Sequence, residues 1–200
     1  MDAISDFSST PVDVILVILV GYLIGSIPIA NLVASRRASI DLREVGDGNP
    51  GFWNARETLG RMAAVPVLIG DVSKGLAAAG IGVLLAADGV WGIGYVAGGA
   101  AMVGHAFPVF AKFVGGRSIL TFVGTVLIVI PVATLISIGI LFTVFVATRS
   151  LAWGSRVGML ALPFVQIVVD GPNRTAATGV LMTFIGLRFG QAALADRRRA

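Results

Sequence analysis

The stretch Ile119–Thr148, ILTFVGTVLIVIPVATLISIGILFTVFVAT, contains no charged residue. A transmembrane helix needs about 20 mainly apolar residues. The stretch is therefore too long for one comfortable helix and too short for two full ones. Pro131 lies inside it and has no N–H to donate, so it breaks or kinks a helix. We predict two shorter membrane helices that meet at Pro131; if Pro131 is only a kink, they are one helix.

The rest of the chain is similarly apolar. Hydrophobic residues make up 56% of its 200 residues and charged residues only 13%, whereas soluble domains carry about 25% charged residues. So much apolar surface has to face lipid. We predict one integral membrane domain over residues 1–200, an all-α bundle of about seven spans, or five or six if Pro131 only kinks. Besides the two helices at Pro131, spans are expected at about Val12–Ala34, Met62–Ala87, Val90–Ala111, Ser155–Val169 and Thr175–Ala192.

The cationic residues collect on alternate connections between these spans. Because cytoplasmic loops of membrane proteins are enriched in Lys and Arg, the pattern predicts an outside N-terminus and a cytoplasmic C-terminus. The cytoplasmic parts would include a polar loop at about 35–61 and a short basic tail at about 193–200. This placement explains the net charge of +4 without nucleic acid as a partner. The cytoplasmic set is Arg36, Arg37, Arg43, Arg56, Arg61, Lys112, Arg117, Arg149, Arg156, Arg188 and Arg197–Arg199, against Asp2, Asp6, Asp88, Asp170 and Arg174 outside.

The composition also excludes several kinds of site. The chain has no cysteine, which excludes disulfides, zinc–cysteine sites and thiolate catalysis. Its one histidine, His105, leaves no room for a multi-histidine metal cluster. No metal is expected.

The first candidate site is the glycine-rich loop of residues 41–54, DLREVGDGNPGFWN. Gly46, Gly48 and Gly51 allow the backbone to turn so that successive N–H groups point at an anion, and Arg43 and Asn49 add donors. The loop contains G-x-G-x-x-G, but no strand precedes it, so we reject a dinucleotide site. The alternative is a simple turn between spans.

The second candidate is the pair Asp71 and Lys74, inside a predicted span. Residues three apart share one face of a helix. Ionisable residues inside a membrane are costly and usually face a partner, water or the bundle interior. The pair is either part of a functional site or a structural ion pair.

The third candidate runs from Gly104-His105 to Gly115-Gly116-Arg117-Ser118. The double glycine followed by an arginine is a second turn suited to an anion. It is predicted on the same side of the membrane as the first loop. A lone histidine near a helix end is more often a structural hydrogen-bonding residue than a catalyst.

Several motifs occur in a characteristic order, mostly within residues 20–125. They are Gly25-Ser26-Ile27-Pro28, Arg43-Glu44-x-Gly46-x-Gly48-Asn49-Pro50-Gly51-x-x-Asn54, Leu59-Gly60, Asp71-x-x-Lys74-Gly75, Gly104-His105-x-Phe107-Pro108-x-Phe110 and Gly115-Gly116. This order resembles the bacterial acyl-phosphate glycerol-3-phosphate acyltransferase family (the PlsY type).

The resemblance implies a seven-span enzyme of the bacterial plasma (inner) membrane with a cytoplasmic active site. Such enzymes transfer a fatty acyl group from acyl phosphate to glycerol 3-phosphate, forming lysophosphatidate for phospholipid synthesis without a metal, coenzyme A or other cofactor. The expected partners are these two substrates and membrane lipids. The resemblance implies that Gly46, Gly48, Asn49 and Gly51 cradle a phosphate, that Arg43 and Arg117 supply charge, with Gly115 and Gly116 in the second turn, and that His105 and Asn54 orient substrate groups or the loops.

The first loop departs from the family pattern at several positions. Asp47 stands where the family usually has serine, and a carboxylate aimed at a phosphate would repel it. Phe52-Trp53 replaces the small Ala-Thr of the family, and Glu57 stands where the family has an arginine.

The second loop and the C-terminus also depart from the family pattern. Arg117-Ser118 replaces Lys-Gly, and the closing His-Arg-x-Asn-Ile stretch and glutamate are reduced to Leu187-Arg188-Phe189-Gly190-Gln191. These departures leave a second hypothesis beside the enzyme. A catalytically degenerate scaffold would act as a lipid-binding or accessory subunit, with a membrane protein as its partner.

Overall fold

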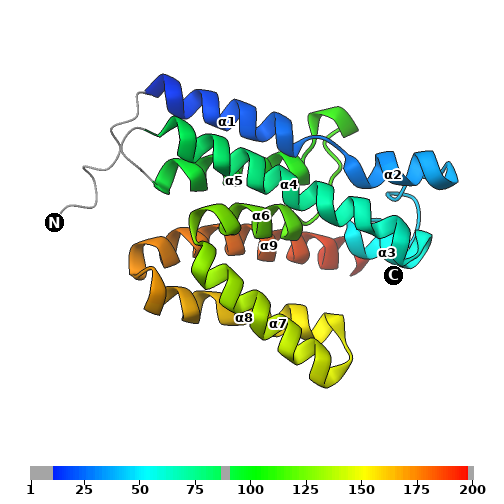
Figure 1. Ribbon diagram of the computed structural model, residues 1–200. Helices are drawn as coiled ribbons and strands as arrows, with labels where there is room; N and C mark the ends of the chain where they lie inside the picture. The colour runs from blue at the N-terminus through cyan, green and yellow to red at the C-terminus, as the bar shows by residue number, and fades with distance from the viewer. Residues whose placement is uncertain (1–10, 87–90, 198–200) are drawn as a thin grey trace.

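The computed structural model describes residues 11–86 and 91–197, and all regular secondary structure in these ranges is helical. Within these ranges, six segments are long and apolar enough to cross a membrane, and α6 is a shorter apolar helix. The predicted all-α membrane bundle is confirmed (Figure 1). Its helices are α1 (Pro11–Gly25), α2 (Ile29–Ala38), α3 (Phe52–Leu59), α4 (Arg61–Leu85), α5 (Trp91–Ala106), η2 (Val109–Ala111), α6 (Ile119–Val129), α7 (Pro131–Thr148), α8 (Leu151–Val169) and α9 (Pro172–Arg197).

The predicted break at Pro131 is confirmed. Helix α6 ends at Val129 and α7 begins at Pro131, where a missing N–H costs no helical hydrogen bond. The Thr134 hydroxyl closes the junction by donating to the carbonyls of Val126 (3.0 Å) and Ile130 (2.9 Å). With 11 residues, α6 is only about 16 Å long.

Several predicted boundaries differ from the structure, and α8 and α9 begin at Leu151 and Pro172, before the predicted Ser155 and Thr175. The first span is interrupted between Gly25 and Ile29, because Pro28 disfavours helix at the residue before it. The polar loop contains an unpredicted short helix, α3. The basic tail is helical as far as Arg197, because α9 continues past the predicted end at Ala192.

Close helix contacts depend on glycine at the centre of the bundle. A Cβ on Gly25 of α1 would collide with the Ala101 carbonyl oxygen of α5, and one on Gly75 of α4 with the Thr121 carbonyl oxygen of α6. Small residues allow membrane helices to approach in this way. Helices α1, α4, α5 and α6 therefore form a compact group.

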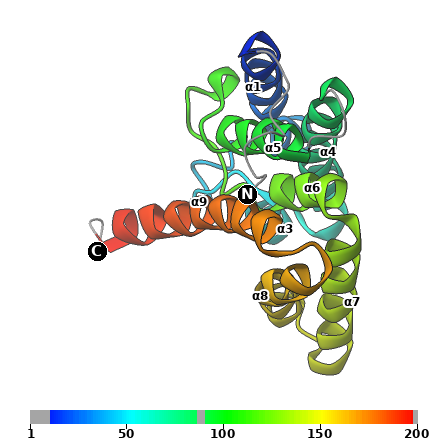
Figure 2. The same ribbon diagram turned by 90° about the vertical axis from the view of Figure 1, so that its left-hand side faces the viewer.

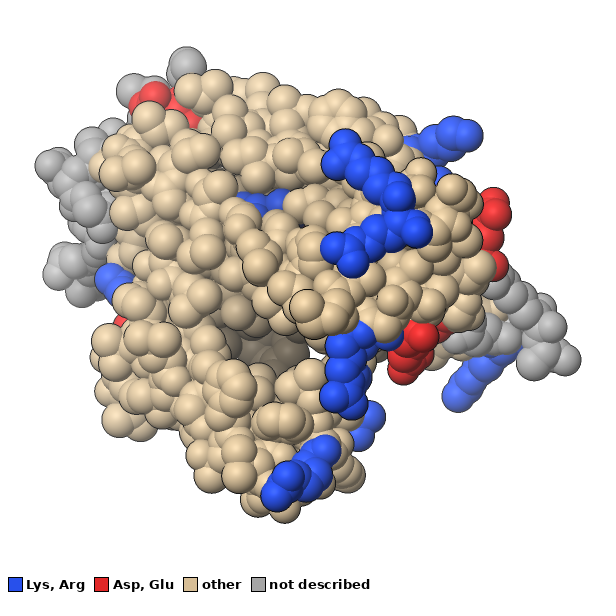
Figure 3. All heavy atoms as spheres, turned by 45° about the vertical axis from the view of Figure 1, so that its right-hand side comes forward, with Lys and Arg blue, Asp and Glu red and all other residues tan. Residues whose placement is uncertain are grey.

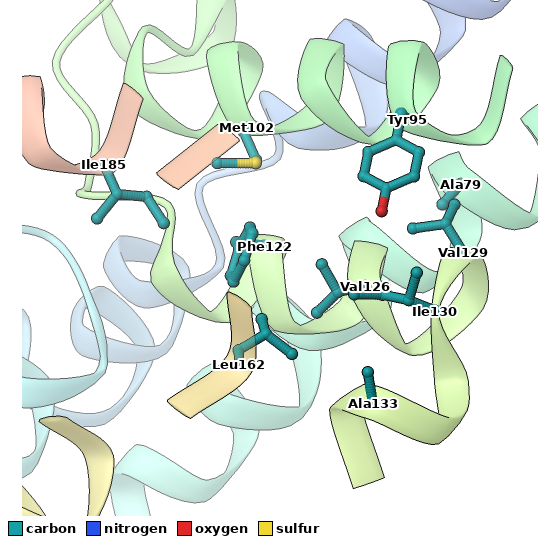
Figure 4. Packing of buried hydrophobic residues seen from close by; sticks show 10 residues of the cluster. All are labelled: Ala79, Tyr95, Met102, Phe122, Val126, Val129, Ile130, Ala133, Leu162 and Ile185. Atoms are coloured by element: carbon teal, nitrogen blue, oxygen red, sulfur yellow. The ribbon is translucent and has the colours of Figure 1, made fainter. Parts of the chain in front are cut away.

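The last three helices pack around this group less closely. In Figure 2 the α7–α8 hairpin and α9 extend away from it in different directions. The main apolar core lies where they meet it, with Phe122 and Met102 facing Leu162 of α8 and Ile185 of α9 (Figure 4). A polar contact adds to this core, because the Tyr95 hydroxyl pairs with Thr178 Oγ1 (2.8 Å) and accepts from Gln166 Nε2 (3.2 Å).

We call the end of the bundle that carries residues 39–51 and 107–118 the loop end. Lys and Arg side chains gather toward it in Figure 3, with a few acidic residues among them. This clustering follows the predicted charge pattern, while the side of the membrane it faces stays a prediction. Of the residues used to predict orientation, Asp2, Asp6, Asp88, Arg198 and Arg199 lie outside the described ranges.

Candidate active site

A narrow cleft opens at the loop end. Its walls come from segments far apart in the chain: the break before α2, the first loop, α4, α5 and the second loop. Its lining includes three buried polar side chains and the double glycine, namely Asp71, Lys74, His105, Gly115 and Gly116. Parts of all three candidate sites therefore meet at one place.

Asp71, Lys74 and His105 form a contiguous polar cluster, each less than 10% exposed. Lys74 Nζ lies 2.9 Å from Asp71 Oδ1 and 3.3 Å from His105 Nδ1, and His105 Nδ1 lies 3.5 Å from Asp71 Oδ1. Both Lys74 and Asp71 thus approach the Nδ1 side of the ring, which leaves Nε2 on the side of the second loop.

The second loop packs directly against His105. A Cβ on Gly115 would collide with the His105 carbonyl oxygen and one on Gly116 with His105 Nε2, so neither position has room for a side chain. The Gly116 N–H donates to the His105 carbonyl (3.1 Å), and the Ser118 hydroxyl donates to the Met102 carbonyl (2.7 Å). The turn is thus fixed to the end of α5, with its glycines beside Nε2.

Asn54 organises the first loop from within. Its side chain is 1% exposed; Nδ2 donates to the carbonyls of Leu42 (2.8 Å) and Val45 (2.9 Å), and Oδ1 accepts from the Thr58 hydroxyl (3.0 Å). Gly46 has a φ of +61°, and a Cβ there would collide with Asn54 Oδ1. Asn54 is therefore placed to hold the loop rather than to face the cleft.

The middle of the first loop is a tight turn. Gly48 has a φ of +68°, and the backbone N–H of Asn49 donates to Asp47 Oδ1 (3.1 Å). Gly51 then caps the start of α3. Of the residues in this turn, Pro50 reaches the cleft wall.

Arg43 joins the first loop to the second. Its guanidinium pairs with Asp41 through Nε (2.9 Å) and Nη2, and Nη1 donates to the Ala111 carbonyl (3.0 Å). The hydrogen bond from Arg43 holds the pKa of Asp41 below its ordinary value. The Asp41 carboxylate thus stays charged at neutral pH, and its contribution to stability is lost only as the pH falls below about 4.

Arg117 makes a second link between the loops. Its Nη2 lies 3.2 Å from Asp47 Oδ2, and its guanidinium stacks on the Phe189 ring with 4.7 Å to the centroid. Helix α9 also brings Arg188 to this place, where it stacks on Phe107 of the second loop. Arg188 was not predicted to belong to the site, although an arginine within an apolar helix is a signal of function.

The chain matches known proteins over most of its length. The family model for glycerol-3-phosphate acyltransferase matches residues 15–193. The chain belongs to this family. Acyltransferases of the same name from Symbiobacterium thermophilum (38% identical over 80% of this chain and 78% of the relative) and Agrobacterium fabrum (35% identical over 92% and 88%) are similar to it.

Solved structures of the family share the fold of this acyltransferase. The crystal structure of PlsY, an integral membrane glycerol 3-phosphate acyltransferase, in its glycerol 3-phosphate form superposes with a TM-score of 0.77 at 29% identity, covering 92% of this chain and 93% of the other. The lysophosphatidic acid form gives a TM-score of 0.74 at 27% identity. The family resemblance drawn from the ordered motifs is confirmed.

Proposed function

We propose that this acyltransferase transfers a fatty acyl group from acyl phosphate to the 1-hydroxyl of glycerol 3-phosphate. The C–O bond between the acyl carbon and phosphate breaks, an ester bond to the glycerol oxygen forms, and the hydroxyl proton leaves with inorganic phosphate. The observation that carries the proposal is the position of His105, held by Lys74 and Asp71 with its Nε2 beside the Gly115–Gly116 turn.

The chemistry needs positioning and charge stabilisation more than a protein nucleophile. Acyl phosphate is already activated, and oriented reactants with donors placed where charge develops supply a large share of a catalytic effect. His105 Nε2–H can donate to a substrate oxygen at the turn. Asn54 and Arg43 act by holding the loops, while Arg117 supplies the charge for a phosphate.

We place the acyl chain among the membrane helices and the reacting groups at the loop end. Figure 3 shows a hollow between the main body and the part below it, with mostly uncharged residues around it and a Lys or Arg at its right-hand edge. An alkyl chain suits such a hollow. Together with the positive loop end, this supports a bacterial plasma membrane protein with the loop end in the cytoplasm.

The identity of the acyl donor is tested with purified protein in lipid nanodiscs. We expect lysophosphatidate from glycerol 3-phosphate and acyl phosphate, and none when acyl coenzyme A replaces acyl phosphate; empty nanodiscs are the blank. Product from acyl coenzyme A alone would overturn the donor assignment. No product from folded protein, beside an active relative as control, would favour the degenerate lipid-binding or accessory subunit.

Asp47→Ser is expected to tighten phosphate binding, because the Asp47 carboxylate pairs with Arg117 and also repels an anion. Both side chains are partly exposed, and exposed ion pairs contribute at most about 1 kcal/mol. The KM for one phosphate substrate should therefore fall by only about two- to fivefold. Steady-state kinetics checks this, with Asp41→Ser as a loop control that should not lower KM. An unchanged or higher KM in Asp47→Ser would refute the competition.

A further inference from the structure

The guanidinium of Arg188, on α9, is incompletely hydrogen-bonded. Its guanidinium stacks on the Phe107 ring with 4.6 Å to the centroid, and Nη1 donates to Gln191 Oε1 (2.8 Å). Nη2 reaches the carbonyls of Gly115 (3.4 Å) and Gly116 (3.5 Å), both beyond the usual 2.7–3.2 Å. One nitrogen, Nη2, thus faces the second loop at a loose distance.

The third nitrogen has no partner. Arg188 Nε is buried and makes no hydrogen bond to any residue in the ranges 11–86 and 91–197. A buried N–H without an acceptor is costly, and native proteins rarely keep one without a reason. The geometry therefore calls for an acceptor that the described part of the protein does not supply.

The charge balance at this place points to an anion. Arg117 lies close enough for the two positive charges to repel each other, and it stacks on Phe189, the residue after Arg188. Arg117 is paired with Asp47, whereas Arg188 has no ion pair among the side chains that the structure describes, which do not include that of Asp196. Two arginines are therefore accompanied by a single partly exposed carboxylate, which pairs with Arg117 alone, and this leaves an excess of positive charge.

We propose that Arg188 and Arg117 together bind the phosphate group of a substrate. A phosphate monoester offers several acceptor oxygens and two negative charges, which match a pair of guanidinium forks. Arg43 is a weaker candidate for this role because Asp41 and the Ala111 carbonyl already take its donors. Arg188 thus joins the site as a substrate-binding residue, an inference that rests on the proposed function.

The turn places this phosphate beside the reacting groups. The α-carbons of Gly115 and Gly116 lie against His105, while the carbonyl oxygens of the same residues lie toward Arg188. A phosphate held by the arginine pair is therefore separated from the His105 cluster by the thickness of one backbone turn. Both acyl phosphate and glycerol 3-phosphate carry the required group.

The test compares Arg188→Gln with a matched control, Arg156→Gln. Arg156 also stacks on an aromatic ring, Trp153 at 5.3 Å, but this ring belongs to its own helix, α8, and not to the second loop. We expect Arg188→Gln to raise the KM for one of the two phosphate substrates by at least about tenfold, the effect of losing a hydrogen bond to a charged group. The other KM, kcat and the melting temperature in nanodiscs should change little, as should all values in Arg156→Gln.

The substrate whose KM rises identifies the phosphate that is bound. Unchanged KM values for both substrates, or a loss of kcat in step with a loss of thermal stability, would overturn the proposal and assign Arg188 to packing. Arg188→Lys, which keeps a charge, provides a second variant if Arg188→Gln does not fold. Its KM should rise less than that of Arg188→Gln, and a KM equal to that of the parent would contradict recognition by the guanidinium fork.

Direct binding separates this proposal from the proposed function. If the parent protein shows no turnover, calorimetry with glycerol 3-phosphate and with inorganic phosphate still reports on the arginine pair. Binding by the parent that is lost in Arg188→Gln and kept in Arg156→Gln would support the pair although the reaction assignment has failed. Equal affinity in all three proteins, or no binding by any of them, would refute the pair.

Discussion

Replacing Asp71 by alanine should destabilise the folded protein by about 3–5 kcal/mol, the usual cost of removing one partner of a buried ion pair. Asp71 is 2% exposed and Lys74 4% exposed, so the change leaves a buried ammonium group without its carboxylate. The measurement is the free energy of unfolding in mixed micelles, followed by circular dichroism.

The double variant Asp71→Ala/Lys74→Met is the control for this result. It removes both charges and fills the space of the lysine stem, so it should lose clearly less stability than Asp71→Ala alone. A single variant that loses no more than about 1 kcal/mol would show that water or His105 compensates the lysine, and would contradict an isolated buried pair.

Replacing Arg117 by alanine should lower kcat/KM by about 10- to 150-fold, which corresponds to the 1.5–3 kcal/mol of a hydrogen bond to a charged group. The side chain of Arg117 is only 22% exposed and is fixed between Asp47 and the Phe189 ring, so its charge is presented in one place. The measurement is lysophosphatidate formation in nanodiscs at varied concentrations of each substrate.

Two further variants separate position from charge at Arg117. Arg117→Lys should recover part of the activity, because an ammonium keeps the charge but lacks the planar fork. Arg37→Ala removes a comparable charge from the exposed last turn of α2 and should leave kcat/KM unchanged. If Arg117→Ala keeps the parent rate, Arg117 is not a phosphate ligand.

Much of the fold could be predicted because the membrane imposes long apolar helices. The uncharged run around Pro131 determined two helices and their junction. The break at Pro28 was missed because the apolar residues on both sides gave one continuous hydropathy signal, although proline itself marked the place. Helix α3 was missed because it is short, lies among glycines and charged residues, and has no long apolar run that would predict it.

The local part of the candidate site could also be predicted, but its long-range contacts could not. Helical spacing placed Asp71 beside Lys74, and their contact follows from one turn of α4. The approach of His105 depends on how α5 packs against α4, and the pairing of Asp47 with Arg117 joins two separate loops. A single sequence contains no signal for either contact, so Asp47 was interpreted only as a source of repulsion.

The shortness of α6 determines the depth at which the second turn lies. Its length of about 16 Å is roughly half of a 30 Å hydrocarbon layer. In Figure 1, α4 and α9 extend farther toward the loop end than α6 does, so the turn before α6 is recessed among longer helices. An amphiphile can therefore bring its headgroup to the turn by diffusing sideways within its leaflet. The membrane then acts as a two-dimensional solvent, and encounter depends on the surface density of the lipid substrate rather than on its concentration in water.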